Sequence, residues 1–114
     1  MAKTAKELVA EAQAEVSQIS CDEYIALKDD TPHMLIDVRE RDEWDEGFIE
    51  GAIHIPRGLI EFKIDGVVPE KDTLIILYCR SGGRSSLCGQ ALIKLGYTNV
   101  RSLVGGYEEF CKTK

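Results

Sequence analysis

The segment Thr73–Tyr78 constrains the fold of this chain more than any other. Its sequence, Thr-Leu-Ile-Ile-Leu-Tyr, is rich in residues that favour strands and shows no alternation between polar and apolar side chains. Such a run is typical of a central strand in a parallel sheet, because both faces of that strand are covered by other elements. It therefore predicts a buried strand inside a parallel sheet.

Strand and helix signals alternate along the rest of the chain. Capping signatures at Thr4 and Ser20 predict two helices in the first quarter of the sequence. We expect helices over 5–17, 21–28, around 44, over 59–62, 83–95 and 107–112, strands over 34–38, 52–55, 73–78 and 100–104, and a turn at Gly66. Alternation of this kind indicates an α/β fold with a mainly parallel sheet.

The size and composition indicate an ordinary globular domain. A length of 114 residues predicts one domain with one hydrophobic core. The chain has no apolar run that could span a bilayer and no signal-peptide pattern, so we expect a cytoplasmic protein without a membrane partner. In that setting the four cysteines, at positions 21, 79, 88 and 111, are expected to be reduced. The net charge of −6 argues against a nucleic-acid partner.

The acidic residues are unevenly distributed. Of the 20 Asp and Glu residues, 18 lie within residues 1–72, and none lies between Thr73 and Tyr107. That acid-free segment contains the basic residues Arg80, Arg84, Lys94 and Arg101. The pattern is consistent with a site for a small anion. It is equally consistent with two buried strands and a core helix, which carry few charges in any protein.

A cysteine follows the predicted central strand and begins a glycine-rich loop. The loop reads Cys79-Arg80-Ser81-Gly82-Gly83-Arg84-Ser85 and leads directly into a helix. In open α/β sheets, ligands bind beyond the carboxyl ends of the strands, which is where this cysteine falls. Backbone N–H groups of a curled loop, the amino-terminal end of a helix and two arginines all favour a thiolate and an incoming anion. The alternative is a buried cysteine before a simple turn, and such a turn has no use for two arginines.

Three segments together resemble the signatures of rhodanese-like domains. The first signature is matched by Leu35-Ile36-Asp37-Val38-Arg39-Glu40, Glu43-Trp44 and Gly51-Ala52-Ile53-His54-Ile55-Pro56, the active-site loop by residues 79–85, and the last signature by Gly105-Gly106-Tyr107. The resemblance runs from about Ile19 to Cys111 and implies a three-layer α/β sandwich with helices on both faces of the sheet. Residues 1–18 are then a helical extension packed on a single rhodanese-like domain over residues 19–114. Phe48 and Phe110 depart from the family pattern, in which His and Trp are common near these positions.

The resemblance implies a sulfurtransferase that carries sulfur on a cysteine persulfide. Cys79 would be the nucleophile, Arg84 would orient the loop and the anionic substrate, and Arg80 would add steering charge. Ser81, Gly82 and Gly83 would contribute backbone N–H groups. Ser85 would cap the helix or donate its hydroxyl to the persulfide. The partners implied are a small anionic sulfur donor such as thiosulfate and a thiophilic acceptor such as cyanide or a thiol, with a protein acceptor as a further option and no cofactor or metal.

Two other functional classes remain open from the sequence. The first is a Cys-dependent phosphatase or arsenate reductase, and the second is a persulfide carrier or binding module that serves one protein partner. Four residues separate Cys79 from Arg84, whereas tyrosine-phosphatase loops have five between the corresponding residues. A shorter loop encloses a smaller space, so it favours a single sulfur atom over a phosphoryl group.

The remaining polar residues of the signatures are predicted to be structural. Asp37 and Arg39 are expected to fix neighbouring loops by hydrogen bonds, His54 to be a core residue and Trp44 to pack on a short helix. The helical spacing of Cys88, Ala91, Leu92 and Leu95 places Cys88 on an apolar stripe facing the sheet. The Cys79 side chain is expected to face solvent, so a disulfide between Cys79 and Cys88 is not expected.

Overall fold

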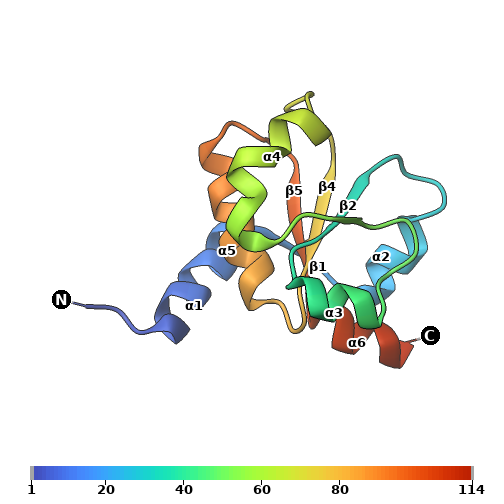
Figure 1. Ribbon diagram of the computed structural model, residues 1–114, viewed down its shortest axis with the longest axis horizontal. Coiled ribbons are helices and arrows are strands. Elements are labelled where there is room, and N and C mark those ends of the chain that lie inside the picture. Colours follow the sequence, from blue (N-terminus) through green and yellow to red (C-terminus); the bar gives the residue numbers. More distant parts are fainter. Residues whose placement is uncertain (1, 114) are drawn as a thin grey trace.

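Five parallel strands form the centre of the molecule, in the order β1-β5-β4-β2-β3 (Figure 1). The structure is a computed structural model and describes residues 2–113. The strands are β1 Ser17–Ile19, β2 Met34–Asp37, β3 Ile53–His54, β4 Ile75–Tyr78 and β5 Val100–Leu103. All four pairings between neighbouring strands are parallel, and β4 occupies the middle of the sheet. The predicted α/β class and the predicted central strand are therefore confirmed.

Helices cover both faces of this sheet (Figure 1). They are α1 Ala5–Glu15, α2 Cys21–Leu27, α3 Arg41–Glu46, the 3-10 turn η1 Arg57–Leu59, α4 Ile60–Val67, α5 Gly83–Lys94 and α6 Gly106–Thr113. Thr4 and Ser20 cap α1 and α2 through the predicted capping boxes. Within residues 2–113, no helix combines the length and the apolar character needed to cross a membrane.

The sheet divides the apolar interior into two clusters, whereas a single core was expected. Ile75 and Leu77 of β4 point to the face covered by α4 and α5, where Ile64 and Leu92 pack against them. Ile76 and Tyr78 point to the opposite face, which α2 and α6 cover. These four strand residues are completely buried. Alternate side chains thus enter different cores, which explains why the sequence of this strand shows no polar alternation.

The structure differs from the sequence-based expectations in three elements. The first helix ends at Glu15, and the next residues form β1, which pairs with β5. β1 contains residues on both sides of the boundary between residues 18 and 19, where the amino-terminal helical extension was expected to end. Gly66 lies inside α4 rather than in a turn, so the helix expected over 59–62 is longer. Each of these segments is too short or too mixed in composition to show a clear period.

The first helix packs closely against α5. A Cβ atom on Gly89 would lie 2.7 Å from Cγ1 of Val16, so only glycine allows this approach. Ala12 of the same helix is completely buried. The side chain of Val9 reaches the first turn of α5, where it would lie 3.6 Å from a Cβ atom on Gly83. Residues before β1 therefore support the helix that begins at the Cys79 loop.

Candidate functional site

The Cys79 sulfur lies inside the curled loop that follows β4. Its Sγ accepts hydrogen bonds from the backbone N–H groups of Gly82, at 3.1 Å, and of Ser85, at 3.4 Å. The side chain is only 1% exposed, so the expectation that it faces solvent is wrong. The loop wraps around the sulfur because both N–H groups turn inward. Ser81, Gly82 and Gly83 were expected to supply the inward N–H groups. Within residues 2–113 Gly82 does so, and the second donor is Ser85 instead of Ser81 or Gly83.

Gly82 makes this curl possible. Its backbone has a φ of +109°, a conformation that residues with a Cβ atom rarely adopt. It is the N-cap residue of α5, so the sulfur lies at the amino-terminal end of that helix. The helix dipole adds positive potential at this end. Negative charge on the sulfur is thus stabilised by two N–H groups and by the helix.

Three serine hydroxyls lie directly behind the loop. Ser85 Oγ is 3.6 Å from Cys79 Sγ and 2.7 Å from Ser102 Oγ. Ser86 Oγ donates to the Gly82 carbonyl oxygen at 2.9 Å and contacts Ser102 Oγ at 3.2 Å. All three serines are buried. The role of Ser85 was considered from the sequence, whereas Ser86 and Ser102 carry no local signal there.

The first turn of α6 is hydrogen bonded to the backbone of the Cys79 loop. The N–H groups of Tyr107 and Glu108 donate to the carbonyl oxygens of Cys79, at 2.8 Å, and Arg80, at 3.1 Å. Gly106 allows this approach, because a Cβ atom there would lie 2.4 Å from the Cys79 carbonyl oxygen. The backbone of Gly106 also has a φ of +59°. This contact gives the Gly-Gly-Tyr segment a physical role in positioning the loop.

Arg84 is engaged by a carboxylate of α3. Its two terminal nitrogens, Nη1 and Nη2, donate to the two oxygens of Glu43 at 2.8 and 3.0 Å. The guanidinium fork that was expected to face an anionic substrate is therefore already paired in this structure. The hydrogen bonds from Arg84 lower the pKa of Glu43 to about 2. They also raise the pKa of Arg84.

This ion pair predicts a stability that depends on pH. Glu43→Gln should lower the free energy of unfolding by about 1–2 kcal/mol at pH 7, because the pair is only partly shielded from solvent. The folded-state pKa of Glu43 lies below its ordinary value of 4.5, so the stabilisation is complete above that value and is lost as the pH falls towards 2. Urea unfolding at several pH values measures this difference.

Glu46→Gln is the matched control, since it makes the same chemical change on an exposed residue of the same helix. We expect it to have little effect at any pH. A gap between wild type and Glu43→Gln that stays constant from pH 7 to pH 2 would contradict the ionic origin of the effect.

The other charged residues of the signatures make structural contacts. Arg80 is exposed and pairs with Glu108 at 2.9 Å, and Ser81 is also exposed. Arg39 pairs with Asp37 at 2.6 Å, and both side chains are buried. Arg39 also donates to the carbonyl oxygen of Gly47 at 2.6 Å. These contacts tie the end of β2 to the loop after α3, which is the kind of role predicted for this pair.

An aromatic stack lies beside this pair. The Trp44 ring stacks on Phe48, with ring centroids 3.9 Å apart, and lies 4.9 Å from the His54 ring. His54 Nε2 donates to the carbonyl oxygen of Arg39 at 2.8 Å. Trp44 is thus a packing residue on α3, as predicted. His54 was expected to be a core residue, but it is only half-buried, and its ring nitrogen is satisfied by the backbone. Among residues 2–113, no three His, Cys, Asp or Glu side chains come together in a way that could hold a metal ion.

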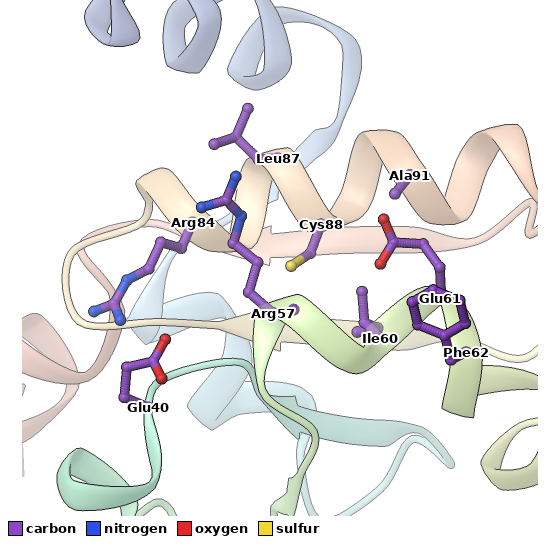
Figure 2. A pocket seen from close by; sticks show the side chains of 10 residues that line it. Glu40, Arg57, Ile60, Glu61, Phe62, Arg84, Leu87, Cys88 and Ala91 are labelled. Carbon is purple, nitrogen blue, oxygen red and sulfur yellow. The ribbon is translucent and has the colours of Figure 1, made fainter.

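A cavity of about 540 Å³ opens between α5 and the η1–α4 segment, next to the loop (Figure 2). Arg84 and Cys88 line it from α5, and Arg57 lines it from η1. Arg57 was not singled out from the sequence. Cys88 is buried among apolar residues, as predicted from the helical stripe, and burial raises the pKa of its thiol to about 12. All four cysteines are free thiols in the structure.

Comparison with known proteins identifies the family. Residues 20–113 match the rhodanese-like domain family. The chain belongs to this family. It is 37% identical, over 92 residues, to a putative mitochondrial thiosulfate sulfurtransferase of Schizosaccharomyces pombe; the match covers 71% of this chain, which spans 65% of the length of that protein. It is 32% identical to the thiosulfate sulfurtransferase PspE of Escherichia coli, over 69% of this chain and 75% of that protein.

The whole fold of this chain is also found in a solved structure. A Rhodopseudomonas palustris protein, described as having unknown function and as a possible tyrosine phosphatase, superimposes with a TM-score of 0.91. The alignment covers 99% of this rhodanese-like chain and 92% of that protein, at 24% sequence identity. At that identity the likeness concerns the fold alone. The resemblance that the sequence motifs indicated is therefore confirmed at the level of family and fold.

Proposed function

We propose that this rhodanese-like domain is a sulfurtransferase that carries a sulfur atom on Cys79 as a persulfide. The donor is a thiosulfate-like anion, and the acceptor is a thiophile such as cyanide or a thiol. The observation that carries this proposal is the pair of N–H groups, from Gly82 and Ser85, that point at the Cys79 sulfur. Named sulfurtransferases among the relatives support the same reaction class.

The reaction proceeds in two displacements. The Cys79 thiolate attacks the outer sulfur of thiosulfate, a new S–S bond forms, and the bond between the two thiosulfate sulfurs breaks. The electron pair of that bond leaves with sulfite, so total charge is conserved. A cyanide ion or a thiolate then attacks the outer sulfur of the persulfide, and the bonding pair returns to Cys79.

The loop contributes electrostatic stabilisation to both steps. Negative charge passes from the attacking sulfur to the terminal sulfur and back, while the loop donors and the end of α5 stay fixed. Donors that are already oriented need no rearrangement during the reaction, which is the advantage of an oxyanion hole. The contacts of Tyr107 and Glu108 with the loop carbonyls hold these donors in place.

A phosphatase activity is the rival hypothesis, and the site argues against it. Phosphoryl transfer at a cysteine needs a guanidinium whose fork faces the phosphate oxygens. Here the Arg84 fork is occupied by Glu43, and the loop is one residue shorter than in tyrosine phosphatases. We therefore expect negligible hydrolysis of an aryl phosphate.

The test compares two reactions of the same protein. Thiocyanate formation from thiosulfate and cyanide should be readily measurable, whereas p-nitrophenyl phosphate hydrolysis should not exceed background. A pure carrier or binding module would form the persulfide without turning over small acceptors. Efficient phosphatase turnover, or the absence of thiocyanate formation, would contradict the proposed function.

A further inference from the structure

The Cys79 loop brings together several groups that bind oxyanions. The N–H groups of Gly82 and Ser85 turn inward, and the amino-terminal end of α5 adds positive potential. Arg84 belongs to the first turn of the same helix. Converging N–H groups, a helix end and a guanidinium are the features by which proteins bind phosphate and sulfate. A short loop limits phosphoryl transfer to the sulfur, but it does not by itself prevent such an anion from binding at the mouth of the loop.

Glu43 occupies the guanidinium that such an anion would use. The Nη1 and Nη2 atoms of Arg84 donate to the two carboxylate oxygens of Glu43 at 2.8 and 3.0 Å. This is the bidentate geometry in which arginine binds a carboxylate or a phosphate. The two side chains are only 30% and 23% exposed, so water screens their attraction incompletely. The carboxylate of α3 therefore takes the place of an external anion on Arg84.

The first turn of α3 holds this carboxylate in place. Glu43 Oε1 also accepts a hydrogen bond from the backbone N–H of Glu40 at 2.9 Å, which is part of the capping box of the helix. The same oxygen accepts from Arg84 Nη1. Movement of the carboxylate away from Arg84 consequently breaks the cap as well. An incoming anion must displace a group that is held at two points, which a freely rotating surface carboxylate is not.

The other charges near the loop do not replace the Arg84 fork. Arg80 is exposed and is already in an ion pair. Glu40 lies near Arg84 and adds a further negative charge there (Figure 2). Arg57 lines the neighbouring cavity from η1, and its charge is the same whether or not Glu43 carries one. Arg84 is thus the cation through which Glu43 can control the binding of an anion.

We propose that Glu43 is a specificity-determining residue that keeps phosphate and similar oxyanions away from the Cys79 loop by occupying Arg84. A sulfur donor is captured covalently when Cys79 attacks its outer sulfur, whereas phosphate has no sulfur to transfer and can only compete for the site. Glu43 touches neither the sulfur nor the donor and acts through Arg84. The inference deepens the proposed function and rests on it for the reaction that is protected from inhibition.

Inorganic phosphate is the probe, and the ¹H–¹⁵N NMR signals of the Gly82 and Ser85 N–H groups report its binding at pH 7 and constant ionic strength. In Glu43→Gln the amide oxygen can still accept from the Glu40 N–H, but the NH₂ group cannot accept from Arg84. The phosphate Kd of this variant should be at least about tenfold lower than that of wild type, as expected when a charge-assisted contact becomes available. Phosphate should also inhibit thiocyanate formation by Glu43→Gln competitively with thiosulfate. A residue that only supports the fold would not tighten anion binding when it is replaced.

Glu46→Gln is the matched control, because it removes the same charge from an exposed residue of α3. Its phosphate Kd should equal that of wild type. The double variant Glu43→Gln/Arg84→Gln should lose the gain, since the fork is then absent. An unchanged Kd in Glu43→Gln, an equal gain in Glu46→Gln, or a gain that persists in the double variant would overturn the inference and leave the proposed function intact. If wild type forms no thiocyanate, the proposed function fails, and the NMR titration still decides whether Glu43 excludes phosphate.

Discussion

Arg39→Met should lower the free energy of unfolding by about 3–5 kcal/mol, the largest loss expected from any single change of charge in this protein. The substitution leaves the Asp37 carboxylate buried without its partner. That carboxylate is 0% exposed and receives hydrogen bonds from Arg39 Nε, at 3.0 Å, and Nη2, at 2.6 Å. A buried charge without a partner costs far more than an exposed one, because water cannot solvate it. Urea unfolding monitored by circular dichroism measures the change.

Arg41→Met provides the control for this prediction. Arg41 lies two residues further along the chain and pairs with Asp45 at 3.0 Å, but both side chains are exposed. Exposed ion pairs contribute about 0–1 kcal/mol, so this variant should remain close to wild type. The double variant Asp37→Leu/Arg39→Met should recover part of the stability, since no buried charge remains. If Arg39→Met lost no more stability than Arg41→Met, the buried pair would not have the role assigned to it.

Cys79→Ser should reduce kcat/KM for sulfur transfer from thiosulfate by roughly a thousandfold or more, as expected for the loss of a nucleophile. A serine hydroxyl does not ionise at neutral pH and cannot hold the transferred sulfur as a persulfide. The fold should survive, because a serine oxygen can accept hydrogen bonds from the Gly82 and Ser85 N–H groups that now reach the sulfur. Steady-state thiocyanate formation measures the loss.

Cys111→Ser is the corresponding control. It makes the same replacement at the exposed cysteine of α6, and activity should be retained. A Cys79→Ser variant with more than about a tenth of wild-type activity would assign the chemistry to another thiol.

The central strand and the Cys79 loop were predictable because each depends on local chemistry. Residues 73–78 carry the pattern of a strand buried on both faces, and β4 is such a strand. A cysteine followed by Gly82 and Gly83 before a helix requires a tight curl of the backbone. The depth of Cys79 was not predictable in the same way. The residue pattern indicates that loop N–H groups point inward, although it named Ser81 and Gly83 and not Ser85 beside Gly82. It contains no information about α6, whose N–H groups hold the loop carbonyls.

The parts of the site that the sequence did not reveal join elements that lie far apart in the chain. Glu43 belongs to a run of charged residues that resembles a solvated helix face, yet it pairs with Arg84 forty-one positions away. Ser102 lies in β5 and meets Ser85 only because β5 is hydrogen bonded to β4. Arg57 lines the same cavity as Arg84 because the η1–α4 segment packs against α5. Local periodicity and residue spacing in the sequence give no indication of these contacts.

Intact-mass spectrometry after mixing the protein with thiosulfate tests the persulfide most directly. Wild type should gain the mass of one sulfur atom, and addition of cyanide should remove it. Cys79→Ser should gain nothing under the same conditions, whereas Cys111→Ser should behave like wild type. Absence of the gain in wild type, or the same gain in Cys79→Ser, would contradict the assignment of sulfur transfer to Cys79 and its loop.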